Sequence, residues 1–504
     1  MQHFLFQTFK KAGKFLRIGR NLSLLLFFAA ACTAAPAATV TPLATEATLT
    51  AAASLPSATP LPTRTTYDPG ELVDYIAQDG DTLPALAAHF NTSEKEIREA
   101  NPSLPKDVTI LPAGMPMKMP IYYMALWGNP YQILPDALYV NGPAQSGFNT
   151  VEFVNAHPGW LKSYSALAGG ATRTGGDLIN YVATEFSISP RLLLALAEYQ
   201  AGALSNPVLD EENQDYPLGY ENIYHKGFYL QLTYVANFLN DTYYRYKAGN
   251  FNTINHLDGT IEHPDPWQNA ATVTLQNYFS TYMPVQDYNT AIYDSGFAAT
   301  YKSLFGDPWQ NLQPHFPGSL TQATLTLPFQ AGKTWAFTGA PHTGWGQVGS
   351  YPLAALDFAP PTSVGGCYVS SDYTLAVADG EVVRSETGLI ALDLDEDGDE
   401  RTGWVIIYLH IADNDKTRPG TLLKAGDPIG HPSCEGGEAT GTHVHIARKY
   451  NGEWIPADSA LPFVMDGWTA HNGSEAYLGT LTRNGQVVTA SDKSSPHSMI
   501  TAGN

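Results

Sequence analysis

The sequence is poor in cysteine, and this limits its covalent cross-links. It has 3 cysteines among 504 residues. Only Cys367 and Cys434 lie beyond the N-terminal segment, and they can form a single disulfide in an oxidising compartment. Neither belongs to a CxxC pair, which disfavours a thiolate metal site.

Basic residues and histidines are also scarce. The chain holds 27 lysines and arginines against 48 aspartates and glutamates, which gives a net charge of −21. Such an acidic surface repels nucleic acids, so we expect no nucleic-acid partner. Histidine contributes 14 residues, and two of them flank one valine in "THVHIA", at His443 and His445.

The apolar run near the N-terminus, "LSLLLFFAAAC", is short for a membrane span and suits the core of a signal peptide. Basic residues precede it and no acid does. Residues 1–32 resemble a bacterial lipoprotein signal with Cys32 as the lipidated residue, although Ala29 stands where that pattern prefers leucine. An ordinary secretory signal is the alternative. Both interpretations predict export, and the first predicts a lipid anchor at the outer face of a bacterial cytoplasmic membrane.

After the signal, the composition changes twice. Residues 33–69 are rich in Ala, Thr and Pro, without a sustained apolar periodicity, and predict a disordered tether.

Residues 70–121 then predict a strand, two helices and a strand. The motifs "GDTLPALAAHF" and "EIREANP" resemble a LysM domain. The resemblance implies binding to the glycan of peptidoglycan, with contacts at Gly80, Asp81, Thr82 and Asn101. A domain of this fold that has lost sugar binding is the alternative.

The middle region, 122–320, predicts buried helices. "SPRLLLALAEYQAG" has Ser189 as a cap and Pro190 at the first helical position. This helix weakly resembles that of lysozyme-like transglycosylases, but Gln200 replaces the catalytic glutamate and an amide cannot protonate a leaving oxygen. Glu198 lies two residues earlier and would point elsewhere. A helical spacer or binding domain is the interpretation we favour.

Short β-rich runs separated by turns fill residues 321–465 and predict an antiparallel all-β domain. Because side chains alternate along a strand, His443 and His445 share one face and can serve one metal site. A catalytic zinc site needs about three protein ligands and an open position. The remaining candidates are Asp357 in "ALDFAPP", His410 in "IIYLHIA" and His342 in "TGAPHTGWG".

The order of these runs carries a second resemblance. "ALDFAPP", "VADGEVV", "IIYLHI", "LLKAGDPIGHPS" and "TGTHVHIARKYNGEWIPA" together resemble the lysostaphin/LytM-type zinc endopeptidases of peptidoglycan. The resemblance implies Zn²⁺ as the cofactor, with Asp357 and His445 as ligands. It implies that His410 and His443 are the catalytic histidines.

The first metal ligand departs from that family's pattern. The family places a histidine four residues before the aspartate, where this chain has Leu353. We therefore predict His342, fifteen residues before Asp357, as the third ligand, across a glycine-rich insertion. If His342 does not reach the metal, the chain would be a non-catalytic peptidoglycan-binding scaffold or hydrolase activator.

A second metal motif lies at residues 393–404. Asp393, Asp395 and Asp397 have the spacing of a calcium loop, but Trp404 replaces the closing glutamate. We therefore favour a solvated acidic turn over a Ca²⁺ site.

Residues 466–504 predict a hairpin at Asn484-Gly485 and a disordered tail. We therefore expect a multidomain α+β protein: a βααβ LysM domain, a helical middle domain and an antiparallel all-β peptidase domain.

Overall fold

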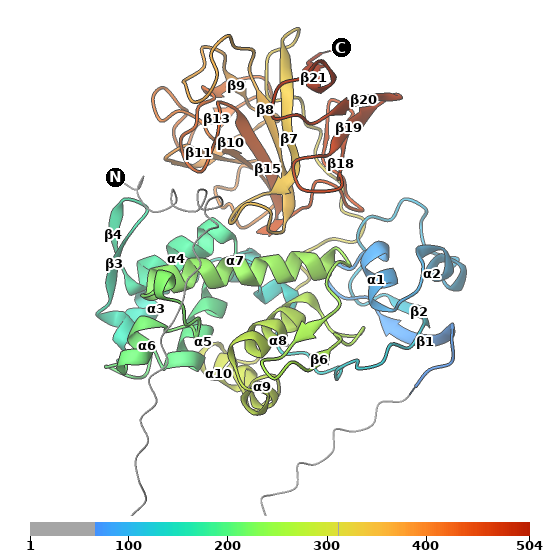
Figure 1. Cartoon of the computed structure of the whole chain (residues 1–504), viewed down its shortest axis with the longest axis vertical. Helices are drawn as coiled ribbons and strands as arrows, with labels where there is room; N and C mark the ends of the chain where they lie inside the picture. Colours follow the sequence, from blue (N-terminus) through green and yellow to red (C-terminus); the bar gives the residue numbers. More distant parts are fainter. Residues whose placement is uncertain (1–65, 311, 504) are drawn as a thin grey trace, which may run out of the picture. The chain divides into compact units, whose positions relative to one another are not determined.

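The computed structural model describes residues 66–310 and 312–503. The predicted lipidation site at Cys32 and the tether up to residue 65 lie outside the described residues. Along the described part, a small α/β region is followed by helices and then by strands (Figure 1). No described helix is both long enough and apolar enough to cross a membrane.

The first region is the predicted βααβ unit. Its elements are β1 (Glu71–Ile76), α1 (Leu83–His89), α2 (Glu94–Ala100) and β2 (Pro116–Ile121). The two strands pair in antiparallel register. Ser93 begins α2 with a capping box, in which its hydroxyl accepts from the Glu96 amide and the Glu96 carboxylate accepts from the Ser93 amide.

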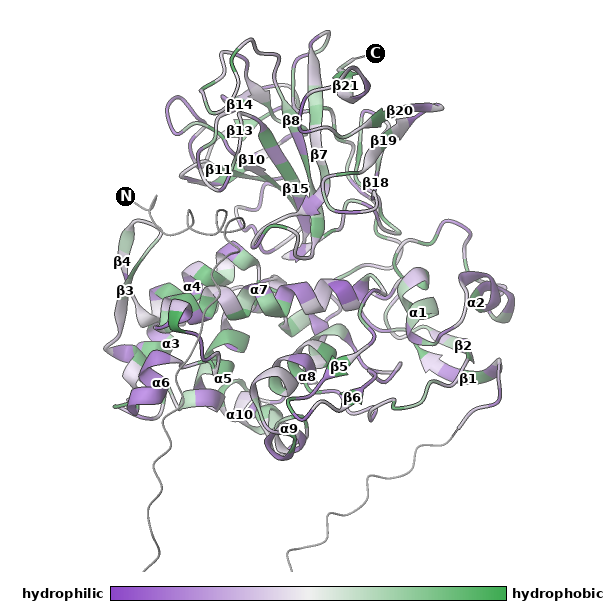
Figure 2. Cartoon of the chain, in the orientation of Figure 1, coloured by the Kyte–Doolittle hydropathy of each residue, from purple (hydrophilic) through white to green (hydrophobic). Residues whose placement is uncertain are grey.

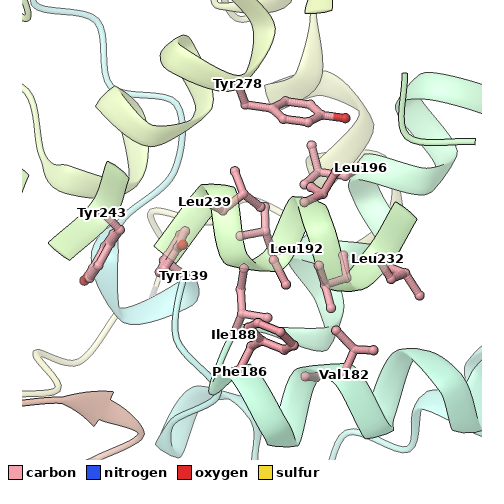
Figure 3. Close-up of a cluster of buried hydrophobic side chains, with 14 of the residues drawn as sticks. Tyr139, Val182, Phe186, Ile188, Leu192, Leu196, Leu232, Leu239, Tyr243 and Tyr278 are labelled. Carbon is pink, nitrogen blue, oxygen red and sulfur yellow. The ribbon is translucent and has the colours of Figure 1, made fainter. Parts of the chain in front are cut away.

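The middle region is helical, as predicted. Its helices are α3 (Thr150–Ala156), α4 (Gly175–Phe186), α5 (Pro190–Ala201), α6 (Glu211–Asp215), α7 (Phe228–Lys247), α8 (Ala270–Tyr282), α9 (Val285–Ala291) and α10 (Phe297–Phe305). Two short hairpins accompany them, β3 (Ser165–Ala168) with β4 (Ala171–Thr174) and β5 (Ile254–Asn255) with β6 (Ile261–Glu262). Side chains from α4, α5, α7 and α8 interdigitate in a core (Figure 3). Exposed α6 is hydrophilic throughout (Figure 2).

The C-terminal region is built from antiparallel strands. Its large sheet has the order β13 (Leu422–Leu423), β10 (Gly380–Glu386), β11 (Leu389–Asp393), β12 (Trp404–Leu409), β15 (Val444–Tyr450), β8 (Leu353–Ala359), β7 (Thr334–Thr343) and β21 (Met499–Thr501), with β16 (Glu453–Trp454) paired to β15. A smaller sheet contains β17 (Val464–Met465), β18 (Trp468–His471), β19 (Thr480–Arg483) and β20 (Gln486–Thr489), and β9 (Thr374–Leu375) pairs with β14 (Pro428–Gly430). The predicted fold class, with its antiparallel all-β C-terminal domain, is confirmed.

The end of the chain belongs to this fold. The hairpin of β19 and β20 turns at Asn484 and Gly485, as predicted. The tail beyond it, which the sequence led us to expect as disordered, forms β21 and pairs with β7. Ile500 supplies the physical reason, because its side chain is buried in the core of the C-terminal region.

The two faces of the large sheet pack against different partners. Ala355, Leu409 and Ala447 belong to one core with the helices. Leu356 and Ile446 point the other way, into a core shared with the C-terminal strands. This is the alternation that a pleated strand imposes. The helical region therefore covers one face of the sheet.

A buried cluster of charges joins all three regions. His315 lies between two carboxylates: its Nδ1 is 2.5 Å from Asp79 Oδ2, and its Nε2 is 2.6 Å from Glu453 Oε2. Lys247, at the end of α7, places Nζ 2.7 Å from the other oxygen of Glu453. We call Asp79, Lys247, His315 and Glu453 the charge junction. Because burying unpaired ions is costly, each charge here depends on its partners.

Candidate metal centre

Three predicted ligands come from three adjacent strands. His342 lies on β7, Asp357 on β8 and His445 on β15, where Asp357 and His445 are direct cross-strand partners. His342 Nε2 is 2.8 Å and His445 Nδ1 is 3.5 Å from Asp357 Oδ1. One ligand atom from each residue lies within 4.8 Å of the others. The structure thus brings together the residues that the sequence separates by up to about a hundred positions.

Irregular pairing explains how the distant His342 reaches this group. The register between β7 and β8 shifts between Phe337 and Gly339, between Gly339 and His342, and between His342 and Thr343. Such bulges re-aim side chains and are common next to active sites. Leu353, at the position where the family carries its histidine, pairs with Thr343 instead.

The three residues fit a metal ion by their hydrogen bonding. Both ring nitrogens of His342 and Oδ1 of Asp357 are buried, and apart from the contacts within this group they have no hydrogen-bond partner. An unpaired buried polar atom is costly, so atoms of this kind call for an explanation such as a bound ion. His445 Nε2 lies 3.1 Å from the Gly344 carbonyl, which can only accept, so the proton sits on Nε2 and Nδ1 keeps its lone pair. Two imidazoles and one carboxylate form a donor set that suits zinc.

The two predicted catalytic histidines lie beside this group. The rings of His410 and His443 are 4.5 Å apart, and His443 Nε2 is 3.7 Å from Asp357 Oδ2. His410 Nδ1 donates to the Glu435 carbonyl at 2.9 Å, and His443 Nδ1 donates to the Gly441 carbonyl at 2.8 Å. Each ring therefore keeps Nε2 free for proton transfer. His410 adopts a left-handed backbone (φ 63°), a strained conformation of the kind often found at functional sites.

Burial governs the electrostatics of the site. His342, Asp357, His410 and His445 are each at most 6% exposed. Desolvation lowers the pKa of His410 to about 3, helped by the neighbouring His443 and His445, so this ring is neutral. Burial alone would raise the pKa of Asp357, but His342 and His443 hold it well below its ordinary value. Burial also lowers the pKa of His445.

Two further residues of the site were not predicted. The ring of Tyr477 stacks on His342, with centroids 4.2 Å apart. Gly339 lies opposite Asp357, and a side chain there would collide with Tyr477 and with the Asp357 carboxylate. Neither residue belongs to a recognisable short motif. Tyr477 lies beyond residue 465, where we expected the peptidase domain to end.

Comparisons with known proteins relate parts of the chain to known domains and relatives. The LysM domain family model matches residues 75–120, and the model of the LasA N-terminal domain matches residues 132–318. Protease LasA of Pseudomonas aeruginosa is 26% identical over 322 residues, which cover 60% of this chain and 72% of the relative. The β-lytic metalloendopeptidase of Lysobacter enzymogenes is 28% identical over 137 residues, covering 26% of this chain and 71% of the relative.

The chain joins a LysM domain and a LasA N-terminal domain to a LytM-type peptidase domain. Among solved structures, the M23 metalloprotease pseudoalterin from the deep sea covers 34% of this chain and 96% of its own, at 22% identity and a TM-score of 0.28. The catalytic domain of lysostaphin from Staphylococcus simulans covers 26% of this chain and 89% of its own, at 19% identity and a TM-score of 0.17.

A disulfide borders the LytM-type site. Cys367 and Cys434 are bonded, as the cysteine count allowed. Cys434 directly precedes Glu435, whose carbonyl accepts the hydrogen bond from His410. The cross-link therefore restrains the segment that orients His410.

The acidic turn gives no support to the calcium prediction. Asp393, Asp395 and Asp397 do lie within 4.8 Å of one another. However, Asp393 accepts from the Asp395 and Gly398 amides, and Asp397 accepts from the Asp399 amide and the Thr402 hydroxyl. These are the internal bonds of a turn. Burial raises the pKa of Asp393 to about 7, which weakens it as a cation ligand near neutral pH.

The predicted glycan contacts of the LysM domain are already engaged within the protein. Asp81 accepts from the Tyr75 hydroxyl at 2.6 Å and the Gln78 amide at 2.7 Å. Thr82 caps α1, and Asn101 bridges α2 to the backbone of Lys118. Gly80 is buried, with the ends of Lys247 and Phe316 against it. The sequence could not reveal this, because Lys247 and Phe316 lie far away in the chain.

The helix that resembles lysozyme-like enzymes offers no acid at its end. Gln200 donates to the Tyr278 hydroxyl at 3.1 Å. Glu198 accepts from the backbone amides of Leu204 and Ser205, so its carboxylate closes the turn after α5. Both side chains have structural roles in the LasA N-terminal domain.

Proposed function

We propose that this chain is an exported zinc endopeptidase that hydrolyses peptide bonds of peptidoglycan, with its LysM domain directing it to the glycan. The observation that carries the proposal is the group of His342, Asp357 and His445, in which the buried ring nitrogens of His342 and Oδ1 of Asp357 have no hydrogen-bond partner outside the group. The relatives support it, because one is called a protease and others are called metalloendopeptidases. The lipid anchor at Cys32 remains part of the proposal.

The residues divide into a metal-holding set and a proton-transfer set. His342, Asp357 and His445 would hold zinc, which supplies a Lewis acid for the scissile carbonyl and acidifies the attacking water. His410 and His443 keep Nε2 free because their Nδ1 atoms donate to carbonyls. Nε2 of either ring can accept the proton of the attacking water and later give that same proton to the leaving amine, so that the ring ends the reaction neutral, as it began. Asp357 keeps its charge and faces His443.

A direct experiment tests this function. The full chain is purified, its zinc is quantified by elemental analysis, and newly formed amino termini are measured after incubation with peptidoglycan. We expect one zinc ion per chain and release of peptides, both lost in His445→Ala. A zinc-free chain that still binds peptidoglycan would favour the alternative, a non-catalytic scaffold or hydrolase activator.

Replacing His410 or His443 by alanine is expected to lower kcat by about 10²- to 10⁴-fold while zinc stays bound, because each ring handles protons and neither holds the metal. The measurement is the steady-state rate on a peptidoglycan peptide, together with zinc content. His431→Ala is the matched control, since this histidine donates to the Asp372 carbonyl and packs on Tyr373. An unchanged kcat in His410→Ala and in His443→Ala would contradict the assigned roles.

Glycan binding by the LysM domain is expected to compete with the contacts around Gly80. The double variant His315→Ala/Phe316→Ala removes side chains that lie against Asp79 and Gly80 without altering the LysM sequence. In most molecules Lys247 and Phe316 would cover the loop that carries Gly80, and only molecules with this loop uncovered could bind glycan. Uncovering the loop should therefore strengthen binding to insoluble peptidoglycan by about tenfold or more, because apparent affinity scales with the fraction of molecules that can bind. Pull-down with purified peptidoglycan measures this. Exposed Gln310→Ala is the control, and equal binding of all three proteins would show that the predicted contact loop is not the glycan site.

A further inference from the structure

The loop that joins β7 to β8 is glycine-rich and exposed at its tip. Gly344, Gly346 and Gly349 lie within the segment 344–352, and Gly346 (φ +116°) and Gly349 (φ +87°) adopt backbone conformations that disfavour other residues. Residues 346–349 are exposed. Glycine loses more conformational freedom on ordering than any other residue. A fixed conformation in this loop therefore requires contacts from outside it.

The base of the same loop is part of the metal centre. His342 and Thr343 end β7, and the next residue, Gly344, accepts the hydrogen bond from His445 Nε2 at 3.1 Å. Within the loop, the Thr343 hydroxyl donates to the Ser350 carbonyl at 2.6 Å, and the Gly344 amide donates to the Pro352 carbonyl at 2.9 Å. A displacement of the loop would therefore move His342 and release the bond that fixes the tautomer of His445.

Helix α7 of the LasA N-terminal domain supplies the outside contacts. Asn237 Oδ1 accepts from the Gln347 amide at 2.7 Å, and its Nδ2 donates to the Ser350 hydroxyl at 3.3 Å. One turn further, Asp241 accepts from the Tyr351 amide at 3.0 Å. A side chain at Gly346 would collide with Asn237, which shows how closely the loop approaches the helix.

The other side of Gly344 rests on Trp454, which is tied to the same domain. A Cβ on Gly344 would lie 3.3 Å from the Trp454 ring. The Trp454 amide donates to the Tyr244 hydroxyl at 3.0 Å, and its indole NH donates to the Phe186 carbonyl at 3.4 Å. Gly344 thus lies between a loop that Asn237 of the helical domain holds and the ring of Trp454, which is itself hydrogen-bonded to that domain.

We propose that Asn237 is a positioning residue of the metal centre: from the helical domain it fixes the 344–352 loop, and through it the placement of His342 and the Gly344 bond to His445. This inference rests on the proposed zinc site and adds a residue to it from a different domain. It assigns the helical domain a part in completing the metal centre.

The test compares three variants of the full chain. Asn237→Ala removes both contacts. Asn237→Asp keeps an acceptor for the Gln347 amide and for the Ser350 hydroxyl. Thr233→Ala, on the same helix, removes a hydroxyl that bonds only to the helix backbone at Tyr229 and Leu230. Zinc affinity is measured by competition with a chelator, and the visible spectrum of the Co²⁺-substituted protein reports the ligand geometry. Thermal unfolding without metal reports stability separately.

We expect Asn237→Ala to bind zinc about 10- to 100-fold more weakly, as is typical for residues that orient metal ligands, and to change the Co²⁺ spectrum. Asn237→Asp and Thr233→Ala should stay close to the wild type in both measurements. Zinc affinity and a Co²⁺ spectrum unchanged in Asn237→Ala would overturn the inference and leave the proposed function intact. A wild-type chain that binds no zinc would overturn the proposed function itself, and the inference with it.

Discussion

Replacing Asp357 by asparagine is expected to abolish stoichiometric zinc binding and to reduce peptidase activity by about a thousandfold or more, because the metal supplies several kcal/mol of transition-state stabilisation. The carboxylate is the only anionic ligand in the group and faces both His342 and His443. The amide has nearly the same shape, so the strand pairing with His445 should persist. Metal analysis and the rate of peptide release measure the two effects.

A matched control distinguishes the loss of a metal ligand from the loss of a surface carboxylate. Asp379→Asn removes an exposed carboxylate that pairs with Lys424 and the Ala425 amide and with no member of the metal group. It should change neither zinc content nor rate. An Asp357→Asn protein that retains both zinc and activity would refute the ligand assignment.

Replacing Glu453 by glutamine is expected to lower the free energy of unfolding by about 3–5 kcal/mol, the usual effect of removing one partner from a buried ion pair. The substitution leaves Lys247 and protonated His315 without the carboxylate that contacts both. Urea unfolding followed by tryptophan fluorescence measures the change. The control is Asp74→Asn in the exposed pair with Lys118, where the expected change is about 0–1 kcal/mol.

The same junction predicts a dependence of stability on pH. Burial alone would lower the pKa of His315, but Asp79 and Glu453 raise it to about 9. Lys247 is the cation that faces the same carboxylates. Because the pKa of His315 is higher in the folded than in the unfolded protein, its protonation stabilises the fold. This contribution is complete below the unfolded-state pKa of about 6.5 and is lost as the pH rises through about 9. The free energy of unfolding of the wild type should therefore fall between pH 6.5 and 9, and that of His315→Gln should fall less. Parallel curves for the two proteins would contradict this.

The sequence predicted local features well, because they depend on near neighbours. Alternation along a strand placed His443 and His445 on one face. The turn at Asn484-Gly485 follows from residues within a few positions. His342 was predicted as the third ligand because it is the histidine shortly upstream of Asp357 and a glycine-rich insertion separates the two. The cause of its approach to Asp357, three register shifts between β7 and β8, is not encoded in any short pattern.

The rest of the site depends on contacts between regions far apart in the chain. Asn237 lies more than a hundred residues before the loop it holds, and no periodicity in α7 distinguishes it from other polar positions. Tyr477 follows the peptidase motifs and reaches His342 only because the C-terminal strands fold back. The burial of Gly80 likewise requires Lys247 and Phe316 from elsewhere.

The pairing of β21 with β7 has a practical consequence for the boundaries of the LytM-type domain. A chain truncated at residue 465 would lose Trp468, Leu481 and Ile500 from its interior. It would also leave β7, the strand that carries His342, as an unprotected sheet edge. Exposed edges of this kind invite association with other chains. A soluble fragment that reports faithfully on the metal centre therefore has to include Met499–Thr501, even though none of these residues belongs to the metal group.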